Sequence, residues 1–215
     1  EADGELAKRE HTARELAEMM VGATLNAPSR KAKEPGAVAL AVHGLSVASP
    51  GAFGTSLKDV SFQVRAGEVF GIGGVAGNGQ DELLLALSGE LRSAKAAVQI
   101  EGNDVGDHGP TERRRRGLVT APEERLGHAA APDMSLTENA LLSGAVRKGL
   151  TSRGFIDWTA TRAFADGIVK TFDVRTPGTQ AAGRSLSGGD LQKVVIGREI
   201  LQTPAVIVVN QPTWG

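Results

Sequence analysis

The spacing of apolar residues changes along the chain, and each spacing predicts a different kind of element. Residues 39–47 and 57–64 favour strands, and the second alternates apolar and polar side chains, as an antiparallel sheet with one face in water requires. Later segments are short and continuously apolar, which is typical of strands buried in a parallel sheet. These segments are residues 69–73, 97–102, 117–121 and 204–210.

Segments with helical spacing separate the apolar runs. They cover residues 80–88, 112–116, about 136–147, 157–172 and 189–202. Such an alternation predicts an α/β fold, with helices flanking a parallel sheet and an antiparallel β subdomain beside it.

The middle of the chain is helical over a longer stretch than one strand-to-strand crossover needs. Ser135 and Glu138 have the spacing of a capping box before one helix, and Asp157 can cap the next helix. The second helix carries one apolar stripe, interpreted as core packing, of Ala165, Ile168, Val169 and Phe172. We therefore predict a helical subdomain at about residues 125–183.

A polar segment with proline and glycine, residues 26–37, predicts a linker. Residues 5–21 before it have a helical pattern, whereas all the strand-like segments follow it. The main domain is therefore expected to occupy residues 38–215.

Composition excludes several classes of protein. The 215 residues carry a net charge of −1, so no overall charge favours nucleic acid or an acidic membrane surface. The four arginines at 113–116 are interpreted as the solvated face of a helix. The chain has no cysteine, which excludes disulfides and thiolate metal sites. No apolar run approaches the roughly 18 residues that span a bilayer.

A glycine-rich turn joins one predicted strand to the helix that follows it. Gly74 and Gly79 have the spacing of a loop whose backbone N–H groups hold phosphate. Such loops continue with a lysine and a hydroxyl residue, but Gln80 and Asp81 stand there instead. Gln80 brings no charge, and the carboxylate of Asp81 repels phosphate while it can ligate a cation.

Two other interpretations of this turn stay open. Gly71, Gly73 and Ala76 match a dinucleotide-binding fingerprint, although Glu101 lies too far along to serve as its acidic residue. The turn could also connect strand and helix without any ligand.

Two further motifs lie near the end of the chain. Residues 186–190 read LSGGD and open a helix that Ser187 can cap, with Asp190 completing a capping box. Adjacent glycines at a helix start are locally unfavourable, so a close backbone approach to another group explains them better. An apolar strand then ends in Asn210 and Gln211, at the edge where open α/β sheets bind ligands.

Taken together, the glycine loop, the LSGG segment and the apolar strand resemble the nucleotide-binding domain of the ATP-binding cassette (ABC) transporter family, over about residues 36–215. The resemblance is closest to the second, degenerate cassette of the tandem ATPase subunits that serve simple-sugar and nucleoside importers. The loop GNGQDEL and the stretch VTAPEER (119–125), followed by MSLTENALL, carry this narrower likeness. It also implies that residues 1–25 are the helical remnant of a preceding cassette.

The resemblance implies a P-loop NTPase fold that takes ATP and Mg²⁺. The nucleotide-binding positions would be Phe53, against adenine, and the loop residues Gly74, Gly77, Asn78, Gly79, Gln80 and Asp81. Asn210 replaces the metal-binding aspartate and, with Asp81, would hold Mg²⁺ weakly, while Gln211 replaces the catalytic glutamate. The four changes balance in charge, so we expect weak Mg-ATP binding and little or no hydrolysis at this loop. The family pattern continues beyond Gly215, so the cassette is expected to be C-terminally truncated.

In this family two cassettes stack head to tail, and each signature faces the other's phosphate loop. The resemblance therefore implies that Ser187, Gly188 and Gly189 contact the γ-phosphate of another cassette, in the same full-length chain or a second copy. Asp190 stands where glutamine or asparagine is usual. Other implied partners are transmembrane permease subunits and, indirectly, a substrate-binding protein, but not nucleic acid.

The leading hypothesis is the energy-coupling ATPase component of a sugar or nucleoside importer, peripheral on the cytoplasmic face of the membrane and soluble as this fragment. The alternative is a non-hydrolysing scaffold or regulatory module with the same fold that binds protein partners. A dinucleotide-dependent oxidoreductase is disfavoured, because neither LSGG nor NQPT has a role in one.

Overall fold

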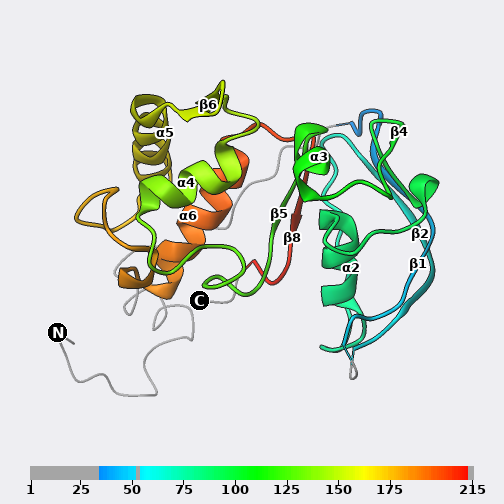
Figure 1. Ribbon diagram of the computed structural model, residues 1–215. Coiled ribbons are helices and arrows are strands. Elements are labelled where there is room, and N and C mark those ends of the chain that lie inside the picture. Colours follow the sequence, from blue (N-terminus) through cyan, green and yellow to red (C-terminus); the bar gives the residue numbers. More distant parts are fainter. Residues whose placement is uncertain (1–33, 52–53, 213–215) are drawn as a thin grey trace, which may run out of the picture. The chain divides into compact units, whose positions relative to one another are not determined.

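The computed structural model describes residues 34–51 and 54–212. The described residues from Pro35 onward form one compact unit. The proposed remnant at residues 1–25, most of the predicted linker and Phe53 lie outside the described residues. Figure 1 shows the elements of the described part in chain order.

The first sheet is antiparallel and has the strand order β2-β1-β3-β4. Its two long strands are β1 (Val38–Val47) and β2 (Leu57–Arg65), so the strands predicted at 39–47 and 57–64 are confirmed. Two short strands, β3 (Val98–Ile100) and β4 (Asn103–Asp104), complete the sheet.

The apolar run at 97–102 was expected in the parallel sheet, and this expectation is wrong. Its strand β3 pairs antiparallel with β1. Val98 and Ile100 are buried, whereas Gln99 between them is partly exposed and donates to Asp104 Oδ1 at 2.7 Å. This alternation marks a strand with only one buried face, which suits an antiparallel ladder.

The parallel sheet consists, in the described residues, of one pair of strands. β5 (Leu118–Ala121) pairs in parallel with β8 (Val206–Val209), with Leu118 opposite Val206 and Ala121 opposite Val209. The register confirms the strands predicted at 117–121 and 204–210. The carboxyl ends of both strands therefore lie at one edge, where residues 122–125 and 210–212 emerge.

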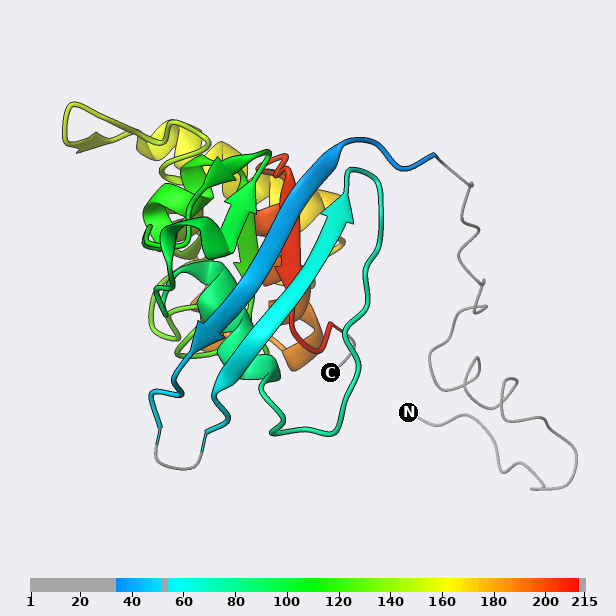
Figure 2. The same cartoon turned by 90° about the vertical axis from the view of Figure 1, so that its right-hand side faces the viewer.

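The apolar run at 69–73 is not a strand, contrary to the prediction. Figure 2 shows it within a long loop that leads from the end of β2 to the start of α2. Val69 is 79% exposed and Ile72 is 52% exposed, while Phe70 stacks on Phe62 with ring centroids 5.2 Å apart. A strand needs a neighbour for its N–H and C=O groups, and none of the described strands pairs with this segment.

Five α-helices lie where the sequence predicted helices. They are α2 (Gln80–Ser88), α3 (Pro110–Arg115), α4 (Leu136–Gly144), α5 (Trp158–Thr171) and α6 (Gly188–Ile200). Two 3-10 turns (Lys95–Ala97 and Gly183–Ser185) and a hairpin of β6 (Thr151–Ser152) and β7 (Phe155–Ile156) join them. Among the described residues no helix combines the length and the apolar character that crossing a bilayer requires.

The helix caps predicted at Ser135, Asp157 and Ser187 are confirmed, but Asp190 does not complete the predicted capping box, because its carboxylate accepts from the Ser187 hydroxyl and not from the Ser187 N–H. The Ser135 hydroxyl accepts from the Glu138 N–H at 3.1 Å, and the Glu138 carboxylate accepts from the Ser135 N–H at 2.8 Å. Asp157 Oδ1 accepts from the Ala160 N–H at 2.9 Å. Each cap satisfies a backbone donor that the first turn of a helix leaves free.

Helices α4, α5 and α6 share one hydrophobic core. Its buried members are Leu136, Ala140, Leu150, Phe164, Ala165, Ile168, Val174 and Val194. The stripe predicted on α5 packs into this core, because Val169 and Phe172 lie against it beside Ala165 and Ile168.

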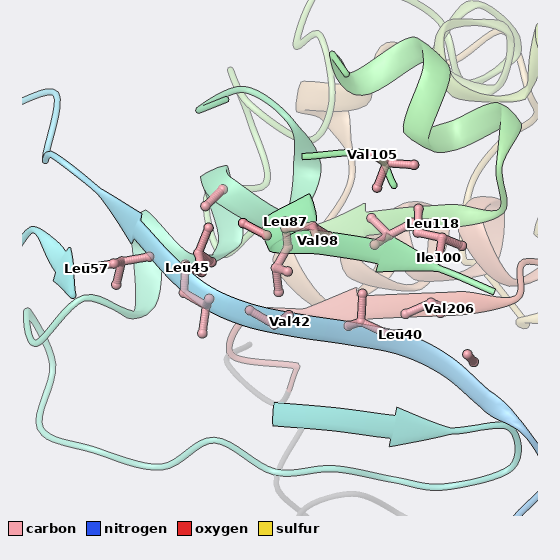
Figure 3. Close-up of a cluster of buried hydrophobic side chains, with 14 residues drawn as sticks. Leu40, Val42, Leu45, Leu57, Leu87, Val98, Ile100, Val105, Leu118 and Val206 are labelled. Atoms are coloured by element: carbon pink, nitrogen blue, oxygen red, sulfur yellow. The ribbon is translucent and has the colours of Figure 1, made fainter. Parts of the chain in front are cut away.

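A second core joins the antiparallel sheet to the parallel pair. Figure 3 shows side chains of β1 and β3 meeting those of α2, β5 and β8. Leu40, Val42, Leu87, Leu118 and Val206 are among its buried members. Full burial of one such side chain contributes roughly 1.5–3 kcal/mol, so this core holds β8 in place beneath the antiparallel sheet.

The four consecutive arginines are not a uniformly solvated face. Arg113 is completely buried and donates to the carbonyl oxygens of Ala86, Leu87 and Gly106. Burial lowers the pKa of Arg113 to about 10. Ala86 and Leu87 lie in the last turn of α2, whose carbonyl groups lack helical partners, and a guanidinium with five N–H groups can satisfy several at once.

The next arginine, Arg114, forms an ion pair with the fully buried Glu199. Only Arg115 and Arg116 match the prediction of a solvated face, because they are exposed and pair with Glu112. The prediction of a solvated face is therefore wrong for Arg113 and Arg114, whose side chains face inward.

Candidate functional site

The glycine loop leads directly into a helix, as its spacing predicts. Gly77 and Gly79 have φ values of 84° and 103°, which residues with a Cβ rarely adopt, and Gly79 is the N-cap of α2. The first N–H groups of α2 therefore open toward the loop.

The side chain of Gln80 forms two hydrogen bonds with the backbone of this loop. Its Oε1 accepts from the Asn78 N–H at 3.0 Å, and its Nε2 donates to the Val75 carbonyl at 3.1 Å. A Cβ added to Gly74 would lie only 2.7 Å from the same Nε2, so Gln80 also leaves Gly74 little room for a side chain. The amide thus occupies the Asn78 N–H group, one of the backbone donors of the loop.

Charge at the start of α2 is negative. Asp81 and Glu82 lie in its first turn, and Glu82 Oε1 accepts from the Thr55 N–H at 2.9 Å. Residues 74–82 include no lysine or arginine. Two carboxylates offset the positive end of the helix dipole, which is worth only about 0.3–1 kcal/mol to an exposed anion. As arranged, the loop offers a triphosphate neither a cation nor a free Asn78 N–H group.

The two residues expected to hold Mg²⁺, Asn210 and Asp81, lie together and are hydrogen-bonded to each other. Asn210, just beyond β8, donates from Nδ2 to Asp81 Oδ1 at 2.8 Å. The opposite amide orientation would set two oxygens face to face, so the donor must point at the carboxylate. This hydrogen bond occupies one of the two carboxylate oxygens that could ligate a cation. The described residues contain no cluster of three His, Asp or Glu side chains that could hold a metal ion.

Gln211 stands beside Asn210 with a positive φ of 47°. Its Nε2 donates to Glu123 Oε2 at 3.0 Å, and both residues line one small pocket at the edge of the parallel pair, together with Arg125 and Asn210. An amide cannot act as a general base, although it can orient a water molecule.

The signature lies at the start of α6 and faces solvent. Ser187, Gly188 and Gly189 are exposed, and nothing lies within 4 Å of a Cβ added to Gly189. Ser187 is the N-cap of α6, and its Oγ accepts from the Asp190 N–H at 3.2 Å. No hydrogen bond in the described part of the chain joins residues 187–190 to the glycine loop.

Asp190 turns inward, away from this exposed turn. It is buried, and its Oδ1 accepts from the Arg175 N–H at 3.1 Å, while its Oδ2 accepts from the Ser187 hydroxyl at 2.7 Å. The hydrogen bond from Ser187, followed by that from the Arg175 backbone, holds the pKa of the Asp190 carboxyl below its ordinary value.

Sequence reasoning gave Arg125 no role, but the structure places it beside the signature. Its Nη1 donates to the Gly188 carbonyl at 2.8 Å. Residues 122–125 therefore contact both motifs, through Glu123 at Gln211 and through Arg125 at Gly188. The signals in the sequence were the family likeness of residues 119–125 and a charged stretch directly after a predicted strand.

Comparison with known proteins gives a consistent result. A family model described as ABC transporter matches residues 57–214. The guanosine import ATP-binding protein NupO of Bacillus subtilis is 35% identical over 202 residues, which cover 94% of this chain and 39% of that protein. The ribose import ATP-binding protein RbsA 1 of Rubrobacter xylanophilus is 38% identical over 202 residues, with the same coverage of both chains. The chain thus spans about two fifths of these relatives.

Solved structures share the fold. The ATP-binding cassette MJ1267 in its ADP conformation has a TM-score of 0.61 and 21% identity, over 83% of this chain and 70% of that one. The cassette MJ0796, solved as a dimer bound to ADP and Pi, has a TM-score of 0.63 and 22% identity, over 81% of this chain and 75% of that one. The predicted α/β P-loop NTPase fold is therefore confirmed.

Proposed function

The chain belongs to the ABC transporter family, and we propose that it is the ATP-binding, energy-coupling component of an importer for a sugar or a nucleoside. Two relatives support this substrate range, because they are named as import proteins for guanosine and for ribose. In this proposal the chain acts at the cytoplasmic face of the membrane. It works with permease subunits and, through them, with a substrate-binding protein.

The loop of this cassette binds Mg-ATP weakly and hydrolyses it slowly or not at all. Support comes from the amide of Gln80, which occupies the Asn78 N–H, and from the hydrogen bond between Asn210 and Asp81. Gln211 cannot take a proton from water. ATP with Mg²⁺, when bound at a competent loop, supplies the free energy of phosphoryl transfer.

The signature serves a nucleotide held by another cassette, which is part of the same full-length protein or a second copy. The observation that carries this proposal is the contrast between the two motifs. In the loop, the Asn78 N–H is hydrogen-bonded internally to Gln80, whereas Ser187, Gly188 and Gly189 are exposed at the start of a 13-residue helix. The first N–H groups of a helix have no internal acceptor and suit an anion.

The test is ATP-dependent association. The purified chain is titrated with the Rubrobacter portion, which is the part of the Rubrobacter xylanophilus relative that this chain does not match. The titration is done with and without Mg-ATP, and complex formation is followed by analytical ultracentrifugation. We expect association that requires ATP and is lost in Ser187→Arg. Ser152→Arg, at an exposed serine in β6, is the matched control and should associate normally. If association does not require ATP and is unchanged in Ser187→Arg, the scaffold alternative is favoured.

A further inference from the structure

Ser187 and Asp190 exchange two hydrogen bonds at the start of α6. The Ser187 Oγ accepts from the Asp190 N–H at 3.2 Å, and the Ser187 hydroxyl donates to Asp190 Oδ2 at 2.7 Å. A carboxylate can only accept, so the single hydrogen of the hydroxyl must lie between the two oxygens. Ser187 therefore has no hydrogen left to donate outward.

Asp190 is held in this position from the other side as well. Its side chain is buried, its Oδ1 accepts from the Arg175 N–H at 3.1 Å, and the Lys193 ammonium lies 3.6 Å from that oxygen. Arg175 belongs to the segment after α5, so the carboxylate is anchored to the helical subdomain. Turning Asp190 away from Ser187 would break both contacts.

From this geometry we infer that Asp190 is a positioning residue that withholds the Ser187 hydroxyl from the partner's nucleotide. The inference rests on the proposed function, in which the exposed signature turn meets a phosphate of another cassette. The turn offers backbone N–H groups at Gly188 and Gly189, but the serine contributes a donor only after its bond to Asp190 breaks. Asp190 thereby weakens the closed complex and favours its reopening.

An asparagine at this position reverses the direction of one hydrogen bond. Its Oδ1 can keep the Arg175 N–H, while its Nδ2 donates to the Ser187 Oγ. The serine hydrogen is then free to point outward, at nearly unchanged shape. Asp190→Asn should therefore tighten ATP-dependent association with the Rubrobacter portion by about tenfold, the worth of one hydrogen bond to a charged acceptor.

The gain must depend on the Ser187 hydroxyl. In the double variant Ser187→Ala with Asp190→Asn, affinity should equal that of Ser187→Ala alone, which a double-mutant cycle measures. Asp166→Asn is the matched control. Asp166 lies in α5, outside the signature, and its Oδ1 likewise accepts from a hydroxyl, that of Thr179, at 3.0 Å. It should leave association unchanged.

A second measurement tests the hydrogen bond in the free chain. Carbon-13 NMR titration of the Asp190 carboxyl should show a higher pKa in Ser187→Ala than in the wild type, because the donor that stabilises the carboxylate is gone. An unchanged pKa, or a gain in Asp190→Asn that persists without the hydroxyl, overturns the inference. If Ser187→Arg abolishes association while Asp190→Asn changes nothing, the proposed function stands and this inference fails. If no variant associates in response to ATP, the proposed function itself fails.

Discussion

Asn210 Nδ2 lies 2.8 Å from Asp81 Oδ1, and this hydrogen bond joins the end of β8 to the first turn of α2. The contact bridges 129 residues of sequence and links the two positions that the family resemblance assigned to Mg²⁺. Because an amide faces the carboxylate, the pair is stable without a cation.

Asn210→Asp should replace this attraction with repulsion between two carboxylates. We expect a loss of about 1 kcal/mol in the free energy of unfolding, since one hydrogen bond is removed and a like charge is added. Millimolar Mg²⁺ should restore the loss in the variant and leave the wild type unchanged, as followed by thermal unfolding. Asn103→Asp, at an exposed position whose amide donates only to carbonyl groups, controls for the added charge. Equal responses to Mg²⁺ in both variants would contradict the prediction.

The Gln80 amide should be the main reason why the glycine loop binds Mg-ATP weakly. Gln80→Lys with Asp81→Ser releases the Asn78 N–H and adds a cation, so Mg-ATP affinity should rise by about tenfold or more, one tenfold step being about 1.4 kcal/mol. Adding Asn210→Asp and Gln211→Glu should raise it further. Isothermal titration calorimetry measures both steps. Gln63→Lys, which adds a charge at an exposed position of β2, serves as the control, and an affinity that stays constant across the series would refute the argument.

Gly189 should be needed for association but not for folding. Nothing lies within 4 Å of a Cβ added there, and alanine favours a helix over glycine by up to about 1 kcal/mol. Gly189→Ala should therefore keep or raise the melting temperature while it reduces ATP-dependent association. Gly167→Ala, at an equally open position in α5, should keep both properties. Normal association of Gly189→Ala would mean that no partner backbone approaches this turn.

Glu199 should be central to stability. It is fully buried and accepts from Arg198 Nε at 3.0 Å, from Gln202 Nε2 at 3.0 Å and from Arg114. Burial lowers the pKa of Arg198, but that guanidinium stays cationic. Glu199→Gln leaves it without a counter-charge, so urea unfolding should show a loss of about 3–5 kcal/mol.

The half-buried Glu112, which pairs with the exposed Arg115 and Arg116, is the matched control for this change. Glu112→Gln should have little effect on the urea midpoint, because solvent screens surface ion pairs. Similar losses in the two variants would argue against the buried network.

The capping box of α4 should contribute to stability in a pH-dependent way. The backbone N–H of Ser135, and next its hydroxyl, hold the pKa of Glu138 below its ordinary 4.5. A lowered folded-state pKa adds stability that is complete above 4.5 and is lost as the pH falls through the folded value. Glu138→Gln should therefore be less stable than the wild type at neutral pH, and the difference should shrink in acid. Chemical unfolding at a series of pH values from neutral to acid measures this, and a difference independent of pH would contradict it.

Local signals were sufficient for much of the fold. The caps at Ser135 and Asp157 and the helix starts at Gln80 and Gly188 depend on residues within one turn of each other, so short-range spacing predicts them. The family resemblance also located the glycine loop and the signature from short stretches of neighbouring residues. Arg113 was misjudged because its partners, the last carbonyl groups of α2, are 26 or 27 residues away in sequence.

The sequence by itself determined the helices, the glycine loop, the LSGG turn and the four residues that differ from the family pattern, because each depends on neighbouring residues. Only the tertiary structure decided that residues 69–73 form a loop and that β3 joins the antiparallel sheet, since strands exist only through distant partners. It also decided that Gln80 closes its own loop, that Asn210 bonds Asp81, and that Asp190 takes the Ser187 hydrogen. The direction of a hydrogen bond follows from which donors and acceptors meet in space, and residue spacing does not contain it.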